Sequence, residues 1–112
     1  MESTKLTQKA KDILAKTERE FDPKVTRGQL LTEQMVVGSW GARNWKGIEE
    51  KALLFEVNGA IHKGVVLITL GWEDLYKVYL LDYELNVLSE PKTGIYADDL
   101  VWVIDRLVET PE

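Results

Sequence analysis

Residues 51–81, KALLFEVNGAIHKGVVLITLGWEDLYKVYLL, decide the fold of this 112-residue chain. They contain three runs rich in β-branched and aromatic side chains, separated first by Asn58-Gly59 and then by a turn around Gly71 to Asp74. An Asn-Gly pair between two such runs is the strongest short-range signal for a β-hairpin, because both central residues of a type I′ turn need positive φ. The stretch therefore predicts an antiparallel meander of at least three strands.

A two-residue turn at Asn58-Gly59 also predicts the strand register, because it would pair Val57 with Ala60 and Phe55 with His62. Side chains alternate between the two faces of a strand, so one face of this hairpin is expected to form a core. Its members are Leu53, Phe55, Val57, Val66, Ile68 and Leu70. The opposite face is also apolar, through Leu54, Ile61, Val65 and Leu67. It therefore needs a covering helix, a bulge at Gly64 that changes the phase of the strand, or an interface with another chain.

The N-terminal part of the chain predicts one helix and few other regular elements. Residues 3–21 carry a thin apolar stripe at helical spacing, and this pattern predicts an amphipathic helix, more loosely attached than the centre of the domain. Asp22-Pro23 is interpreted as its end, because the residue before a proline is disfavoured in a helix. We interpret residues 24–32 as a linker with a helical turn near its end, residues 35–37 as a short strand, and residues 38–47 as a loop.

The C-terminal part predicts one more strand and one well-marked helix. Residues 86–89 are expected to form a fourth strand, and residues 90–94 a loop. Residues 97–109 carry a broad apolar stripe of Leu100, Val103, Ile104, Leu107 and Val108, which predicts a helix packed on the sheet. The fold class is therefore α+β: an antiparallel three- to five-stranded meander packed by a C-terminal helix, with an N-terminal amphipathic helix. We expect one domain over residues 1–112, with its core in residues 34–109.

Composition excludes several classes of function. The chain has no cysteine and one histidine, which removes thiol catalysis, zinc fingers and most histidine-based metal sites. No apolar run approaches the roughly 20 residues of a membrane helix, and no secretion signal starts the chain, so we expect a cytoplasmic protein with no membrane contact. Residues 1–51 hold ten Lys/Arg against eight Asp/Glu, whereas residues 52–112 hold four against eleven. The acidic half should repel nucleic acid, and any such contact would use the N-terminal half.

The most unusual segment chemically is the one around Trp40, Arg43, Asn44 and Trp45. Tryptophan and arginine are enriched at binding hot spots, so these side chains are candidates for a partner surface. The alternative is that the tryptophans cap the core and the arginine pairs with a neighbouring acid. A phosphate loop at Gly38 and Gly41 is disfavoured, because the Lys-Ser/Thr pair and following helix of a P-loop are missing.

No catalytic, metal or cofactor site is predicted. His62 could act as a general base, but no positioned nucleophile or carboxylate accompanies it, and we interpret it as structural. The carboxylate pairs Glu73-Asp74 and Asp98-Asp99 could hold a hard cation, but such pairs at turns and helix starts more often serve capping.

Four ordered motifs resemble a family. They are Gly41-Ala-Arg-Asn44, Val66-Leu-Ile-Thr-Leu70, Asp74-Leu-Tyr76 and Ile95-Tyr-Ala-Asp98. Together, over about residues 35–108, they resemble uncharacterised small proteins encoded by phages and mobile elements, although Gly38-Ser-Trp40 departs from that pattern. The resemblance implies an origin rather than an activity. It adds Asp74 and Tyr76 to the candidate binding surface.

These observations favour a small non-enzymatic interaction or accessory protein that binds another protein or a second copy of itself. Its surface would be the segment from Trp40 to Trp45 or the second face of the sheet. One alternative is an acidic mimic or inhibitor of nucleic-acid-binding proteins, which would need carboxylates aligned on one face. Another alternative is a nucleic-acid-associated accessory protein that uses the basic N-terminal half.

Overall fold

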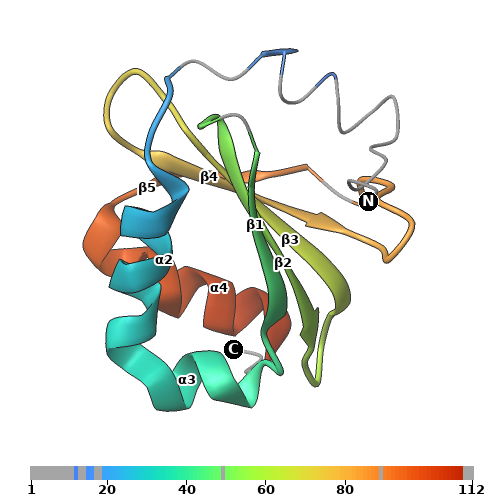
Figure 1. Ribbon diagram of the computed structural model, residues 1–112. Coiled ribbons are helices and arrows are strands. Elements are labelled where there is room, and N and C mark those ends of the chain that lie inside the picture. Colours follow the sequence, from blue (N-terminus) through green and yellow to red (C-terminus); the bar gives the residue numbers. More distant parts are fainter. Residues whose placement is uncertain (1–11, 13–14, 17–18, 49, 89, 110–112) are drawn as a thin grey trace.

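Five antiparallel strands form one sheet in the order β1-β2-β3-β4-β5 (Figure 1). Their bounds are Arg43–Ile48 (β1), Ala52–Asn58 (β2), Lys63–Leu70 (β3), Tyr76–Leu81 (β4) and Lys92–Ile95 (β5). The computed structural model describes residues 12, 15–16, 19–48, 50–88 and 90–109, so the helix predicted over residues 3–21 lies largely outside the described residues. The predicted α+β class and the antiparallel meander are confirmed.

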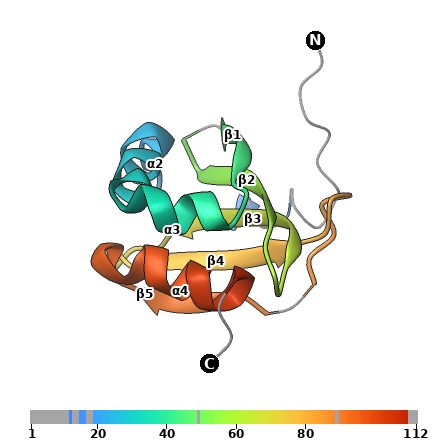
Figure 2. The same cartoon turned by 90° about the horizontal axis from the view of Figure 1, so that it is seen from below.

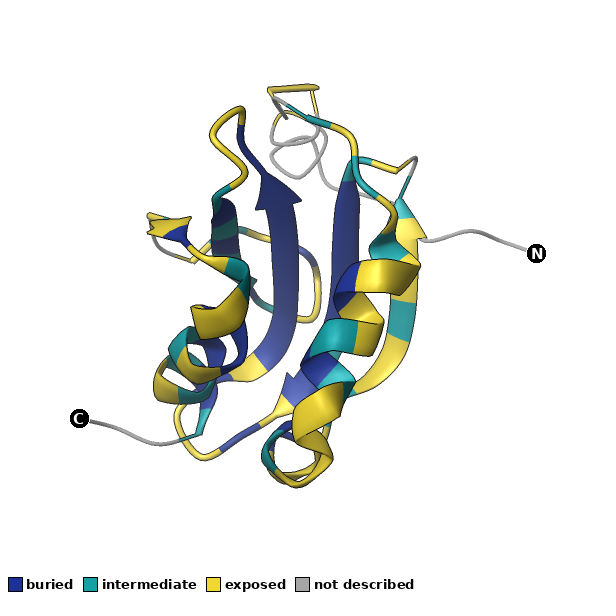
Figure 3. Cartoon of the chain, turned by 90° about the vertical axis from the view of Figure 1, so that its left-hand side faces the viewer, coloured by how far each residue is buried: buried dark blue, intermediate teal, exposed yellow. Residues whose placement is uncertain are grey.

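The helices pack on one face of this sheet. They are α2 (Pro23–Leu30), α3 (Gln34–Ser39) and α4 (Leu100–Val108), with single 3₁₀ turns η1 (Leu31–Glu33) before α3 and η2 (Ala97–Asp99) before α4. Figure 2 shows α3 and α4 lying side by side. In Figure 3 the central strands of the sheet are buried, whereas the edge strand β1 and the outward sides of the helices are largely exposed. The C-terminal helix predicted over residues 97–109 is confirmed.

The linker predicted over residues 24–32 is wrong, because helix α2 begins there. The Asp22 Oδ1 atom accepts a hydrogen bond from the Lys24 backbone N–H at 2.9 Å, and Pro23 occupies the first turn. An aspartate at the N-cap followed by proline is a strong start signal, because proline lacks only an N–H that the first turn leaves unpaired. The pair that we interpreted as a helix end therefore starts the next helix.

The strand predicted at residues 35–37 and the loop predicted at residues 38–47 are also wrong. Met35 to Val37 belong to helix α3, and most of the second segment is strand β1. Helical geometry brings Val37 and Trp40, which are three residues apart, to the same core, where both are almost completely buried. Tertiary packing therefore overrides the β preference of the valines.

The main core lies between the helices and the sheet face that the sequence predicted. Leu53, Phe55 and Val57 of β2 and Val66 and Ile68 of β3 are each at most 2% exposed. Helix α4 covers them with Leu100, Val101, Ile104 and Val108. Burying each such side chain contributes roughly 1.5–3 kcal/mol, so this interface is the main source of stability.

The predicted two-residue turn is wrong, because β2 and β3 are joined by a four-residue loop. Asn58 pairs with Lys63 and Phe55 pairs with Val66. The backbone N–H groups of Ile61 and His62 both donate to the Val108 carbonyl, at 2.8 and 3.1 Å. The Ala60 N–H donates to the Glu109 Oε1 atom at 2.8 Å. The loop thus supplies hydrogen-bond donors to the C-terminal end of α4, where the last carbonyl groups lack partners within the helix.

The second sheet face is covered by the chain itself. Leu54, Val65 and Leu67 are at most 4% exposed, and they form a second cluster with Leu85 from the segment after β4. The Tyr83 hydroxyl from the same segment donates to the Val57 carbonyl at 2.7 Å. Gly64 lies in unbroken register, so it forms no bulge in the β2–β3 pairing. Leu54, Val65 and Leu67 therefore do not form an open interface, whereas Ile61, which was predicted on the same face, lies in the loop between β2 and β3 and is 49% exposed.

Asp82 holds this covering segment in shape. Its carboxylate accepts hydrogen bonds from the backbone N–H groups of Asn86 and Glu84 and from the Asn86 side chain. These bonds, with the Asn86 backbone N–H first, lower the pKa of Asp82 below its ordinary value, although desolvation opposes them. The stabilisation is therefore present at neutral pH and is lost as the pH falls through the lowered pKa.

The last strand is displaced from its predicted position. Val87 forms only an isolated bridge with Leu81, whereas strand β5 occupies Lys92–Ile95, where we predicted a loop. The register between β4 and β5 shifts between Tyr76 and Val78, and Gly94 has a φ of 68°. Positive φ is readily adopted by glycine, so the sequence feature that suggested a loop is a local irregularity of the edge strand.

The assignment of residues 23–30 to helix α2 can be tested directly by a substitution. A Cβ atom added at Gly28 would meet no heavy atom within 4 Å, and the residue lies inside the helix. We expect Gly28→Ala to raise the free energy of unfolding by roughly 0.5–1 kcal/mol, because alanine loses less backbone entropy than glycine in a helix. Urea denaturation followed by circular dichroism measures the change. A destabilised variant would contradict the helix at residues 23–30.

Candidate functional site

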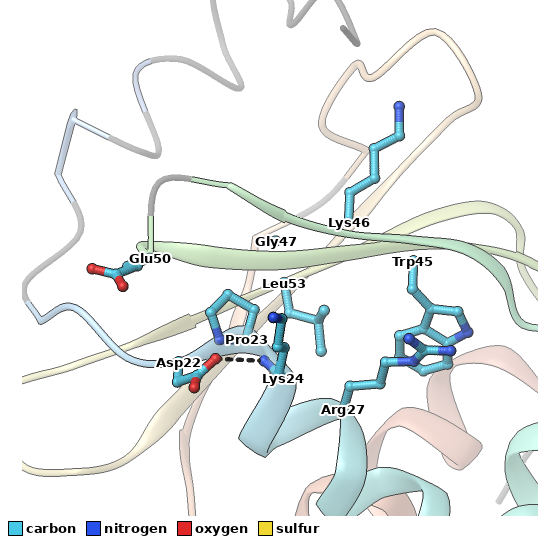
Figure 4. A pocket seen from close by; sticks show the side chains of 9 residues that line it. All are labelled: Asp22, Pro23, Lys24, Arg27, Trp45, Lys46, Gly47, Glu50 and Leu53. Carbon is cyan, nitrogen blue, oxygen red and sulfur yellow. Dashed lines mark hydrogen bonds between the residues drawn. The ribbon is translucent and has the colours of Figure 1, made fainter.

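A groove of about 550 Å³ lies between helix α2 and the edge strand β1, and we call it the β1 groove. Figure 4 shows the residues that line it: Asp22, Pro23, Lys24, Arg27, Trp45, Lys46, Gly47, Glu50 and Leu53. Most come from the start of α2 and from β1, and Leu53 comes from the neighbouring strand β2. Grooves of this size that combine apolar and charged walls are typical binding sites.

Local sequence fixes how close the helix and the strand come. The cap at Asp22 and the proline after it start α2 beside β1. A Cβ atom added at Gly47 would lie 2.7 Å from the Pro23 Cγ atom, so the proline ring packs directly on the strand backbone. Only glycine permits this approach. Direct packing of Pro23 on Gly47 therefore sets the approach of helix and strand, and the exposed side chains of Lys24 and Arg27 line the groove.

Trp45 and Arg27 form the aromatic and cationic wall of the β1 groove. The Trp45 ring stacks on Phe55, with 4.3 Å between ring centroids and 24° between ring planes. The Arg27 guanidinium carbon lies 5.3 Å from the centroid of the Trp45 ring, within the range of a cation–π interaction. Trp45 is half-buried, and its contact with the fully buried Phe55 fixes the ring. A rigid aromatic side chain loses little entropy on binding, which suits a contact residue.

Acidic and basic side chains lie towards opposite ends of the β1 groove. Figure 4 shows Asp22 and Glu50 towards one end, and Arg27 with Trp45 at the other. Lys24 lies between them, on the helix side, whereas the side chain of Lys46 points away from α2. Arg27 and Lys24 are both exposed. A bound carboxylate would therefore be attracted to the Arg27 end and repelled from the other.

Of the predicted site residues, Trp40 lies in the core and not on the surface. It is 0% exposed, its ring stacks 6.2 Å from Phe55, and its indole N–H donates to the Asp105 Oδ1 atom at 2.9 Å. Its carbonyl accepts a hydrogen bond from the Asn58 N–H at 2.7 Å. Trp40 is therefore a core residue, as in the alternative interpretation of the sequence, and its hydrogen bonds connect the end of α3 to α4 and β2.

Arg43 and Asn44 lie together on β1, facing the neighbouring strand. Arg43 Nε and Asn44 Nδ2 both donate to the Glu56 Oε1 atom, at 3.2 and 3.0 Å. Asn44 has a φ of 56°, at the place where the register between β1 and β2 shifts. Both side chains are exposed, and they share the carboxylate of Glu56, whereas the ring of Trp45 packs on Phe55.

Asp74 and Tyr76 lie at the β3–β4 turn and the start of β4, away from the β1 groove lining. Asp74 forms an ion pair with Arg19 and has a φ of 63°. Tyr76 is 9% exposed, its hydroxyl shares a hydrogen bond with the Thr26 hydroxyl at 3.1 Å, and its ring meets Phe21 edge-on. The structure therefore brings Trp45, Arg43 and Asn44 together on one strand but does not gather all six predicted residues into one site.

Lys24 and Arg27 were missed by the sequence analysis. Both lie in the segment that we interpreted as a linker, so their side chains had no predicted face. The signal that could have found them is the Asp22-Pro23 helix start, because residues three apart in a helix lie on the same side. Their approach to Trp45 depends on long-range packing and could not be derived from spacing.

Among the residues that the structure describes, no group of three or more His, Cys, Asp and Glu side chains is arranged to hold a metal ion. Within the same part of the chain, no helix has both the length and the apolar character needed to cross a membrane. His62 is 7% exposed, and its Nε2 atom lies 3.3 Å from the Val65 carbonyl oxygen. Comparisons with protein-family models, with curated proteins and with solved structures found no match to this chain.

Proposed function

We propose that this protein is a small non-enzymatic interaction module that binds an acidic, extended segment of a partner protein in the β1 groove. The observation that carries the proposal is the Arg27–Trp45 pair in the lining of this groove. Tryptophan and arginine are the residue types most enriched at binding hot spots, particularly in pockets that exclude water. An origin in phages or mobile elements stays a prediction from the sequence motifs.

Three features support a protein segment as the occupant. β1 is the outermost strand on its side of the sheet, and edge strands present backbone groups that can pair with an added strand. Lys24 and Arg27 are exposed beside it and complement carboxylates. Asp22 and Glu50 would orient the segment by repelling its acidic side chains from their end of the groove.

The nucleic-acid alternative is supported less well by the same geometry. Single-stranded nucleic acid binds to proteins by stacking bases on open aromatic faces. One face of Trp45 packs on Phe55, and the Arg27 guanidinium lies over the ring. The carboxylates of Asp22 and Glu50 would also repel phosphates.

The second alternative, an acidic mimic of nucleic acid, requires carboxylates that are aligned on one face and not engaged in contacts within the fold. Five carboxylates of the acidic half instead serve separate structural contacts within the described residues. These residues are Glu56 with Arg43 and Asn44, Asp74 with Arg19, Asp82 with its own turn, Asp105 with Trp40, and Glu109 with the Ala60 N–H. This division of roles supports a folded, soluble scaffold better than an imitation of the phosphate backbone.

Selection of a phage-displayed random peptide library on the full chain tests the proposal. We expect enriched peptides rich in Asp and Glu, with Arg27→Ala weakening their binding by about tenfold or more, as for a hot-spot residue. Lys63→Ala, a change of an exposed cation at the start of β3 that does not line this groove, is the matched control and should leave the affinity unchanged. Enriched peptides that lack acidic residues, or that bind Arg27→Ala as tightly as wild type, would refute this function.

A further inference from the structure

A second groove lies at the opposite edge of the sheet, between strand β5 and helix α4, and we call it the β5 groove. Its volume is about 450 Å³. All four residues of β5 line it, so it follows the whole length of the strand. The helix side is formed by Asp99, Val103, Arg106 and Leu107, whose spacing places them along one side of η2 and α4. The groove therefore runs between a strand and a helix, as the β1 groove does.

Part of the lining of the β5 groove is apolar. Val103 and Leu107 are only partly buried, although both pack against the main core. Ile95 is 5% exposed. A Cβ atom added at Gly94 would meet no heavy atom within 4 Å, so the space beside the strand is open at this point. Partly covered apolar side chains along a groove gain stability when a partner's apolar side chain removes them from water.

The charge of the β5 groove differs from that of its surroundings. Residues 52–112 contain only four Lys and Arg against eleven Asp and Glu. Two of those four, Lys92 and Arg106, line this groove, with Asp99 as its one acidic lining residue. Lys92 is exposed at the start of the edge strand. The groove is thus a locally basic site in the acidic half of the chain and complements a carboxylate.

Strand β5 has one edge on which a further strand could pair. β5 is the outermost strand, and among the described residues β4 is the only strand that pairs with it. Its irregularity at Gly94 and its short length limit indiscriminate pairing, because bulges and short edges are the usual protection of sheet edges. A segment that also fills the space against α4 would gain side-chain contacts that a bare edge does not offer.

We infer that the β5 groove is a second binding site, which takes an extended peptide segment that alternates apolar and acidic residues. The apolar side chains pack on Val103 and Leu107, and a carboxylate pairs with Lys92. The inference does not depend on the β1 groove. If both sites operate, the protein connects two segments across the two edges of one sheet.

The test is a titration of isotope-labelled full-length protein with a capped hexapeptide of alternating valine and glutamate, followed by NMR. We expect saturable shifts of the backbone amides of β5 and the methyl groups of Val103 and Leu107. Lys92→Glu should weaken binding at these signals by about tenfold or more, whereas Arg27→Ala should leave them unchanged. A peptide with lysine in place of glutamate should not shift them.

The outcomes separate the two grooves and the other occupants. No shift in β5 and α4 at millimolar peptide, or equal shifts with the lysine peptide, would overturn the inference. Shifts confined to α2 and β1 would overturn it while leaving the proposed function intact. Concentration-dependent dimerisation of the wild type that Lys92→Glu abolishes, measured by analytical ultracentrifugation, would replace the peptide with a second copy of the chain.

Discussion

Trp40→Ala is expected to lower the free energy of unfolding by roughly 3–5 kcal/mol, the usual cost of truncating a buried aromatic residue to alanine. Trp40 is completely buried against Phe55, and its indole N–H bonds to Asp105. Small domains are stable by only about 5–15 kcal/mol, so a substantial fraction of the variant should unfold at low urea concentration. Urea denaturation followed by far-ultraviolet circular dichroism measures the change.

Two further variants define the cause of this loss. Trp40→Phe keeps an aromatic ring but removes the donor to Asp105, and we expect it to cost about 1–2 kcal/mol. Met35→Ala changes a side chain that is 90% exposed and should stay within about 0.5 kcal/mol of wild type. A loss below 1 kcal/mol for Trp40→Ala would contradict its place in the core.

Gly59→Ala should have the second largest effect, a loss of roughly 2–3 kcal/mol. An added Cβ atom would lie 2.3 Å from the Val108 carbonyl oxygen, the atom that accepts hydrogen bonds from Ile61 and His62. The loop must therefore move away from the end of α4, and overpacking of this kind typically costs about 1–3 kcal/mol before any hydrogen bond is lost.

Gly38→Ala is the matched control for Gly59→Ala. Gly38 has open space around its Cα atom, so the same added methyl group should not destabilise the protein. Thermal unfolding of the two variants beside wild type gives the comparison. Equal stability of Gly59→Ala and wild type would show that the loop does not pack on the helix end as described.

The sequence predicted the core face of the hairpin correctly although the predicted turn was wrong. In the structure Phe55 pairs with Val66 and not with His62, a shift of four residues along β3. Side chains alternate with a period of two, so an even shift leaves the side chains of β3 on their predicted faces. The turn itself could not be predicted locally, because its conformation depends on Val108, almost fifty residues later in the chain.

The helices before β1 show a different limit of sequence patterns. Asp22-Pro23 is compatible with a helix end before it and with a helix start after it, and only the second is seen in the described residues. Val36 and Val37 have β-branched side chains, yet they lie in a helix because Val37 and Trp40 are buried together. Local preference is a weak guide where long-range burial opposes it.

The candidate site was predictable only in part. Trp45 and Arg43 could be selected as contact residues from their type alone. Arg27 could not be paired with Trp45, because the two lie on separate elements whose contact depends on the packing of Pro23 against Gly47. Asp74 forms an ion pair with Arg19, and Tyr76 shares a hydrogen bond with Thr26. No spacing in the sequence indicates either contact.

Hydrogen–deuterium exchange of the full chain, with and without a selected acidic peptide, tests the proposed function most directly. The proposal predicts that the peptide slows exchange in β1 and α2, and that this protection is lost in Arg27→Ala but kept in Lys63→Ala. Protection confined to other elements, or protection that Arg27→Ala leaves intact, would contradict the β1 groove as the partner site.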